Sequence, residues 1–443
     1  MKRRDLLVAT AAAAVFPAPA RPAPARPARV RAGKPNAALH FSEIAAAAIA
    51  PDRSPGSAGV LAGIVIGAMH DAGAAAGGRY RPLLAGLPGA RGGDGARGGD
   101  VARGGDVARG GDVARGGDVD AAVAAAAYGV LTGRLPAQAA VLADAYESYL
   151  ALLPGTREVR RGLDTGRRVG EEILRIRAGD GFDAVVPWVQ PAPGPDVFEP
   201  VVTNPDGTPA TPVDVKLPRV RPLVMTSPDQ FRPAGPNRLT SAAYTSDWRE
   251  TRDYGRIDST RRSPAQTGTV QFWAENTYIQ WSRALRGLAA ERGLSTLAAA
   301  RMLGLAHVAV ADALIACFDA KYHFVFWRPV HAIGRAGTDG NPATTADPSW
   351  RSMLVVNHPE YPSAHASFTA AATTAVAAYF GTTRVPLTMT STVTGTTRTY
   401  RSTAGPSNDV GGARIWAGLH FRRSMADGAR LGRRAAALVT RRS

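Results

Sequence analysis

The feature that most constrains the fold is a series of segments whose apolar residues recur at helical spacing, the first two of them rich in alanine. The segments span residues 120–131, 137–153, 157–177, 269–292, 295–319, 365–380 and about 411–439. Few stretches alternate apolar and polar residues as strands do. Residues 181–240 are rich in Pro and Gly, which predicts a long structured loop. We therefore predict an all-α helical bundle with long loops.

The N-terminus has the layout of an export signal. Arg3 and Arg4 precede an apolar run that ends near Phe16, and small residues follow up to Ala20. This arrangement resembles a twin-arginine signal and predicts a periplasmic or extracellular protein. Residues 21–34 are rich in Pro, Ala and Arg, as a disordered spacer would be. We expect residues 35–443 to form a single helical catalytic domain.

The net charge of +17 first raises the possibility of a polyanionic partner. Residues 1–34 hold eight cations and one anion, so seven of the surplus charges lie in the signal and spacer. Residues 89–118 carry five copies of Arg-Gly-Gly-Asp, each nearly neutral, and we interpret them as a flexible insertion. These observations argue against a nucleic-acid partner.

Neither a disulfide framework nor a membrane span is expected. Cys317 is the only cysteine and lies in an apolar stretch, which favours a buried inert thiol. The best apolar run, 60–69, is too short to cross a bilayer and continues into His70 and Asp71.

Three separated segments of the last third carry the chemistry. The first runs from Lys321 to Arg328 and Pro329, the second is Tyr-Pro-Ser-Ala-His at 361–365, and the third runs from Arg414 to His420. Only four of the 53 basic residues are lysines, which makes Lys321 notable. Three cations, the Ser363 hydroxyl, helix N-terminal amides and two imidazoles suit a tetrahedral oxyanion. Two histidines allow one ligand or nucleophile and one general acid-base.

The three segments resemble the signature K-x6-R-P, P-S-G-H and S-R-x5-H-x3-D of a known superfamily. It unites vanadium-dependent haloperoxidases, type 2 phosphatidic acid phosphatases and bacterial acid phosphatases. The stretches 78–88, 231–244, 318–333 and 357–365 further resemble soluble bacterial haloperoxidase-like members. The resemblance implies a helical fold with the anion site inside the bundle.

The resemblance also implies a role for each matching residue. The oxyanion, vanadate or phosphate, would be held by Lys321, Arg328, Ser363, the amide of Ala364 and Arg414. His420 would be the axial vanadate ligand or the phosphatase nucleophile, and His365 the acid-base group. His358 is a possible auxiliary residue, since bromoperoxidase-type members resemble this chain in having an extra His nearby; an exposed loop histidine is the equal alternative.

The chain departs from the superfamily pattern at three positions. Ala364 replaces Gly, which would be costly if its φ were positive. Ala413 replaces the Ser before Arg414. Ser424 replaces the Asp expected four residues after His420, and Asp427, seven residues on, is about 10.5 Å along a helix and too far to orient the imidazole. Ser424 could bond His420 weakly, and the loss of the charge leans toward a peroxidase.

Three functions remain open from the sequence. The leading one is a vanadium haloperoxidase-like enzyme that oxidises a halide with hydrogen peroxide. The second is a phosphomonoesterase that acts on phosphate esters through a phosphohistidine. The third is a non-enzymatic polyanion-binding exported protein that uses the basic tail. The carboxylate partner of Arg414 is also open, with Glu275, Asp312 and Asp319 as candidates.

Overall fold

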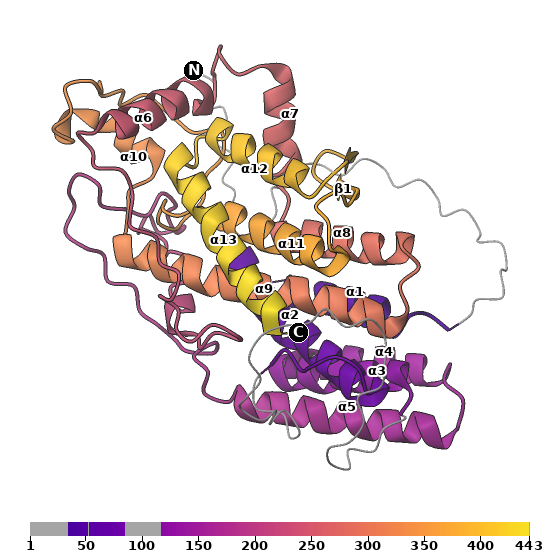
Figure 1. Ribbon diagram of the computed structural model, residues 1–443. Helices are drawn as coiled ribbons and strands as arrows, with labels where there is room; N and C mark the ends of the chain where they lie inside the picture. The colour runs from indigo at the N-terminus through magenta and orange to yellow at the C-terminus, as the bar shows by residue number, and fades with distance from the viewer. Residues whose placement is uncertain (1–33, 52, 85–116, 443) are drawn as a thin grey trace, which may run out of the picture.

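The computed structural model describes residues 34–51, 53–84 and 117–442 (Figure 1). Within these ranges the chain forms thirteen α-helices, three short 3₁₀ helices and one two-stranded sheet. This composition confirms the predicted all-α class. The predicted export signal and spacer lie outside the described residues, apart from Lys34, as does the Arg-Gly-Gly-Asp insertion up to residue 116.

The first six helices are α1 (Ala37–Ile49), α2 (Pro55–Gly77), α3 (Val119–Arg134), α4 (Ala139–Leu150), α5 (Arg157–Ile176) and α6 (Ala242–Gly255). The other seven are α7 (Pro264–Phe272), α8 (Thr277–Glu291), α9 (Thr296–Phe324), α10 (Pro329–Gly334), α11 (Ala364–Phe380), α12 (Ala404–Trp416) and α13 (Arg422–Arg442). The 3₁₀ helices are Pro136–Gln138, Leu217–Arg219 and Ala336–Thr338. Strands β1 (Leu387–Ser391) and β2 (Thr396–Tyr400) pair antiparallel, with Leu387 opposite Tyr400.

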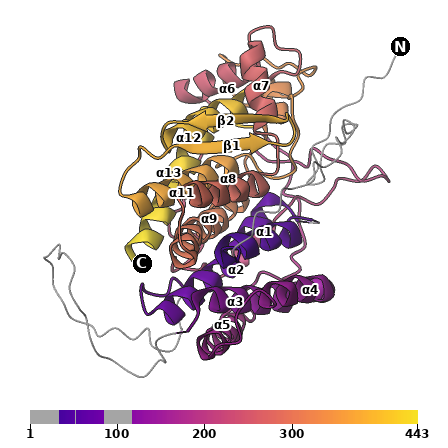
Figure 2. The same cartoon turned by 90° about the vertical axis from the view of Figure 1, so that its right-hand side faces the viewer.

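Helix α9 lies at the centre of the molecule. It packs against α2 on one side and against α11 and α13 on the other, while α3 and α5 cover α2 (Figures 1 and 2). The hydroxyl of Ser295 accepts the N–H of Ala298 at its start, and Val325 ends it with a left-handed φ of 46°. In the last turn of α9 the side chain of Lys321 is buried, whereas that of His323 is exposed.

Two helices bear on the expectation that no segment spans a membrane. By length and composition, α2 and α9 are both apolar enough to cross a bilayer, and the short run 60–69 is only part of α2. In each helix 94% of the apolar window is buried inside the protein. Helices that are apolar on all sides are expected at the centre of a large helical core.

Glycines allow α13 to lie directly on α11. A Cβ built at Gly428 would meet the carbonyl oxygen of Ser363 at 2.5 Å, and one at Gly432 would meet that of Ser367 at 2.2 Å. Because these neighbours are backbone atoms, they cannot rotate away as side chains do. The two helices therefore meet backbone to backbone, next to the start of α11.

Two of the predicted helices are broken. Residues 269–292 form α7 and α8, and the side chain of Asn276 caps α8 by accepting N–H groups from Tyr278 and Ile279. Residues 411–439 divide into α12 and α13 at 417–421, where Gly418 has a φ of +73° and lies against the backbone of Gly255. His420 lies in this second break.

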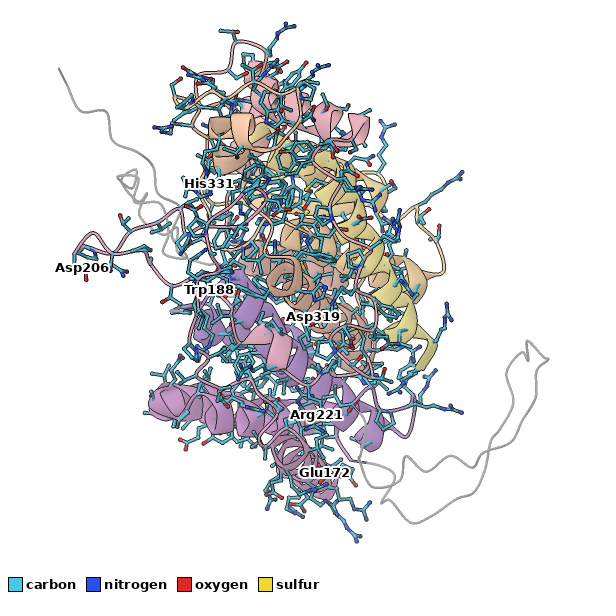
Figure 3. All side chains as sticks on the ribbon, turned by 90° about the vertical axis from the view of Figure 1, so that its left-hand side faces the viewer. Glu172, Trp188, Asp206, Arg221, Asp319 and His331 are labelled. Atoms are coloured by element: carbon cyan, nitrogen blue, oxygen red, sulfur yellow. The ribbon has the colours of Figure 1, made fainter. Side chains whose placement is uncertain are left out.

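The long segment 181–240 is irregular, as predicted, and is held by a buried carboxylate on α9. Asp312 accepts the N–H groups of Leu223, Val224 and Met225 at 2.6, 2.9 and 2.8 Å. In Figure 3, Trp188 lies against the helices, whereas Asp206 lies at the tip of a projecting loop.

The contact between α11 and α13 predicts opposite effects for two glycine substitutions. Gly428→Ala should destabilise the protein by about 1–3 kcal/mol, because a methyl group there overpacks a backbone contact. Gly287→Ala, in α8 with nothing within 4 Å of its Cβ position, should stabilise it by up to about 1 kcal/mol through helix propensity. Thermal unfolding of both variants checks this, and a stabilised Gly428→Ala would contradict the packing described.

Candidate active site

The structure brings the three sequence motifs together in the C-terminal part of the bundle. Lys321 lies in the last turn of α9, and Arg328 directly precedes α10. Ser363 caps α11, and Arg414 lies near the end of α12. The main core lies on one side and an aromatic cluster on the other; the fully buried members of the cluster include Trp248, Trp327, Trp350 and Tyr361.

Backbone carbonyl groups hold two of the buried cations. The ammonium group of Lys321 donates to the carbonyl oxygens of Pro359 and Glu360 at 2.7 and 3.0 Å. Arg328 donates to the carbonyl oxygens of His358 and Leu419 at 2.6 and 2.8 Å. These bonds fix the direction of each cation, and in the part of the chain that the structure describes the carboxylate of Glu360 is the one nearby acid whose charge acts on both of them.

Arg414 is the least satisfied of the three cations. It is 3% exposed, and its one hydrogen bond within the described chain is to the carbonyl oxygen of Trp273 at 3.3 Å. Its Nε is buried without a partner. A buried guanidinium group with no carboxylate partner is costly unless an anion binds to it.

Burial lowers the pKa of each of these groups, which favours the neutral form of the group. Burial lowers the pKa of Lys321 to about 7, that of Arg328 to about 10 and that of Arg414 to about 9. Burial and then the neighbouring cations hold the pKa values of His365 and His420 well below the usual range. Both imidazoles are thus neutral at pH 7 and able to accept a proton or bond an electrophile.

His420 is oriented by a carboxylate that lies in another segment. Its Nδ1 lies 2.9 Å from Oε1 of Glu360, which is 1% exposed and also accepts the N–H of Phe421 at 2.9 Å. Its Nε2 lies 3.5 Å from a terminal nitrogen of Arg328. Burial raises the pKa of Glu360 to about 7, against the opposing effect of its hydrogen bonds and of the nearby cations.

The start of α11 supplies the remaining predicted donors. The Ser363 hydroxyl accepts the N–H of Ala366 at 3.4 Å, a long bond that a better partner could replace. Ala364 is the first residue of α11 and is not among the residues with positive φ, so its Cβ causes no backbone strain. His365 follows it and feels the charges of Arg414, Lys321 and Arg328.

His358 belongs to this cluster and is not an exposed loop residue. Its Nδ1 lies 2.8 Å from Arg328, and its ring lies 5.4 Å from that of Phe318. Burial, and then Lys321 and Arg328, hold its pKa well below the usual range.

The three carboxylates left open as partners of Arg414 all bind elsewhere, so none of them pairs with it. Glu275 pairs with Arg283 at 2.8 Å, Asp319 with Arg232 at 2.7 Å, and Asp312 binds backbone amides. Each of these acids bonds an arginine or backbone amides near it. The site therefore keeps a net positive charge.

The residues after His420 behave as their spacing predicts. Asp427 does not reach the imidazole: it accepts the Tyr361 hydroxyl at 2.5 Å and pairs with Arg423 and Arg430. The Ser424 hydroxyl lies 3.3 Å from Nδ1 of His420, a longer contact than that of Glu360. Three arginines of the basic tail, Arg422, Arg423 and Arg430, are paired with carboxylates.

Glu360 is the residue that sequence reasoning missed. It is the only acidic residue between Asp347 and Asp409, and it lies three residues before Ser363. The absence of the Asp expected after His420 was a signal to look for a carboxylate near the other motifs. The structure provides it from the segment that precedes α11.

Comparisons with known proteins bear on the family and on the fold. Residues 301–443 match the family described as the VCPO second helical-bundle domain, a range that contains every residue predicted for the site. No curated protein matches the chain significantly.

Solved structures of bacterial vanadium enzymes share the fold. A bacterial vanadium-dependent iodoperoxidase is 20% identical with a TM-score of 0.72, over 92% of this chain and 95% of its own. A holo bacterial vanadium-dependent chloroperoxidase is 18% identical with a TM-score of 0.66, over 88% and 92%. An apo form is 17% identical with a TM-score of 0.64, over 86% and 91%.

The fold is therefore that of the bacterial vanadium haloperoxidases. The family match over residues 301–443 and this shared fold both support the vanadium haloperoxidase superfamily predicted from the motifs.

The unpaired state of Arg414 predicts that its removal stabilises the anion-free protein. Arg414→Met should raise the unfolding free energy by about 1–4 kcal/mol, because an uncompensated buried charge is replaced by apolar packing. It should also abolish vanadate binding. Arg177 is a matched control, being 4% exposed and paired with Asp180 at 2.7 Å. Arg177→Met should lower the unfolding free energy by about 3–5 kcal/mol. If both variants lost the same unfolding free energy, Arg414 could not be an unpaired buried charge.

The lowered pKa of Lys321 predicts that anion affinity falls as pH rises. Below about pH 7 the free protein already carries the charge on Lys321. Above this pH each binding event takes up a proton, so the affinity should fall up to about tenfold per pH unit from this group. Titration with tungstate, whose charge is constant over this range, measures the slope. Lys321→Met should bind more weakly with a shallower slope; an unchanged slope would exclude Lys321 as its source.

Proposed function

We propose that this chain is a vanadium-dependent haloperoxidase-like enzyme that binds vanadate and oxidises a halide with hydrogen peroxide. The observation that carries the proposal is the convergence of three buried cations on two neutral imidazoles. Lys321, Arg328 and Arg414 are 0%, 2% and 3% exposed, and Glu360 is the one acid bonded to this group within the described residues. The fold shared with vanadium iodo- and chloroperoxidases supports the same reading.

The residues fit a small tetrahedral oxyanion. The three cations and the Ser363 hydroxyl would neutralise and bond its oxygens, together with the Ala364 amide at the N-terminus of α11. Nε2 of His420 would provide the one direct protein ligand. Vanadate, when bound there, supplies a Lewis acid that activates peroxide toward the halide.

The protein's own part in the reaction is to move protons and exclude solvent. Neutral His365 would accept a proton from hydrogen peroxide and return it to the oxygen that leaves as water. In the overall reaction the O–O bond breaks and the halide loses two electrons. The halide takes up one oxygen as hypohalous acid, and one further proton is consumed from solution. Burial of the cations strengthens their interaction with the anion, since the surrounding medium screens charge poorly.

The phosphomonoesterase remains the second candidate, and one observation favours it. A carboxylate on Nδ1 of His420 leaves Nε2 free to attack phosphorus. His365 would then protonate the departing alcohol, and water would release phosphate from the phosphohistidine. The contact with Glu360 removes the argument that the missing Asp leaves His420 without an orienting charge.

The two functions give opposite responses to vanadate. With peroxide, bromide and a halogenation-sensitive dye, we expect activity that requires added orthovanadate. Hydrolysis of an aryl phosphate, inhibited by vanadate and without any dye halogenation, would overturn the proposal in favour of the phosphatase.

Single substitutions should separate binding from turnover in the same assay. His365→Ala should lower kcat by about 10²–10⁴ and change vanadate affinity little, as expected for an acid-base residue. Lys321→Ala should lose vanadate binding, whereas Lys216→Ala, whose ammonium group lies over the ring of Phe182, should behave like the parent. Normal turnover in His365→Ala would exclude its assigned role.

A further inference from the structure

Hydrogen bonds of both its backbone and its carboxylate hold Glu360 in place. Its backbone N–H donates to the carbonyl oxygen of Phe326 at 2.9 Å, and its own carbonyl oxygen accepts from Lys321 at 3.0 Å. Its carboxylate oxygen Oε1 bonds both Nδ1 of His420 and the N–H of Phe421. A carboxylate fixed by its backbone on both sides can hold an imidazole at a defined angle.

This contact determines which ring nitrogen of His420 carries the proton. Oε1 is an acceptor that already receives the Phe421 N–H, so the Nδ1 facing it is the donor. Nε2 is then unprotonated, and the guanidinium group of Arg328 lies 3.5 Å from it. The lone pair of Nε2 is therefore presented on the side where the cations lie. Partners of this kind on a ligating histidine are worth about 10–100-fold in metal affinity.

No other acid among the described residues competes for this role. Asp427 is occupied by Tyr361 and two arginines. Ser424 is farther from Nδ1 and carries no charge. The superfamily pattern places a carboxylate four residues after the histidine, whereas here the carboxylate comes from the irregular segment before α11.

The second carboxylate oxygen of Glu360, Oε2, lies beside a small cavity. Oε2 is buried without a hydrogen-bond partner; the hydroxyl of Tyr244 is also without a bond of good geometry, and the polar group that acts on it is the indole N–H of Trp327. Glu360 and Tyr244 both line this cavity on the side of the aromatic cluster, which has room for about one water molecule. A water there would satisfy both groups, and the two unpaired atoms make such a site favourable.

We propose that Glu360 is the positioning residue of His420, fixing the Nδ1-protonated tautomer, and that a buried water shared with Tyr244 completes its hydrogen bonding. The inference rests on the proposed function only in requiring that His420 meets the oxyanion. It does not depend on whether the reaction is halide oxidation or phosphate-ester hydrolysis.

The test compares two substitutions of Glu360 by ¹⁵N NMR of the histidine side chains and by orthovanadate titration followed by ⁵¹V NMR. Glu360→Met removes both the charge and the acceptor. We expect His420 to lose the single Nδ1-protonated tautomer and vanadate to bind about 10–100-fold more weakly. Glu360→Gln keeps an acceptor oxygen, so the tautomer should persist with a smaller loss of affinity.

Asp427→Asn is the matched control, because it alters another buried carboxylate that contacts a tyrosine but not His420. It should lower thermal stability and leave the His420 signals and vanadate affinity within about twofold of the parent. A Glu360→Met variant with the parental tautomer and affinity would overturn the proposal, as would an Asp427→Asn variant that reproduces the full loss.

The water is tested separately with Tyr244→Phe. A crystal structure of the parent should show a water within hydrogen-bond distance of Oε2 of Glu360 and the Tyr244 hydroxyl, and Tyr244→Phe should bind vanadate several-fold more weakly. A dry cavity in the parent would overturn this part. If the parent binds vanadate with the expected tautomer but oxidises no halide, the proposed function fails and the role of Glu360 stands.

Discussion

The site depends on the burial of three cations that the protein does not neutralise. Carbonyl oxygens direct Lys321 and Arg328, and Arg414 has almost no partner, so their charge remains available to an anion. Such a cluster opposes folding, since burial favours the neutral form of every member. The extensive apolar packing of α9 against α2 and α11 supplies the stabilisation that holds it together. Oxyanion binding and folding are therefore linked: an anion that neutralises the cluster also stabilises the fold.

The same cluster explains why the two histidines are neutral. Three nearby positive charges and burial disfavour an imidazolium ion at either position. A neutral His420 can bond an electrophilic centre, and an oxyanion bound to the three cations would offset their charges and so allow the neutral His365 to accept a proton. One electrostatic arrangement thus prepares the anion site, the ligand and the base, and it suits vanadate and phosphate chemistry alike. The choice between those reactions must then lie in small differences around the site, such as the environments of His358 and Glu360.

Local residue types predicted much of this from the sequence. Lys321, Arg328, Ser363, Arg414 and His420 could be found because their chemistry and spacing are local properties of the chain. The break between α12 and α13 was missed because the apolar periodicity continues past it, although Gly418, with a φ of +73°, is itself a local signal for the end of a helix. Glu360 was missed for a different reason, since its bond to His420 joins segments 60 residues apart. None of the carboxylates considered for Arg414 pairs with it. The sequence alone does not show which acidic residues lie near a given arginine in the fold.

The contact between α11 and α13 has a consequence for how this protein can change over evolutionary time. Gly428 and Gly432 touch carbonyl oxygens, which every residue possesses, so no substitution on α11 can make room for a larger residue on α13. Elsewhere in the core, a larger side chain can be accommodated when its neighbour becomes smaller. The contact between α11 and α13, which we call the glycine seam, does not allow such paired replacements. Sequence divergence should therefore accumulate around the glycine seam and leave its two glycines in place, even in relatives whose chemistry has changed.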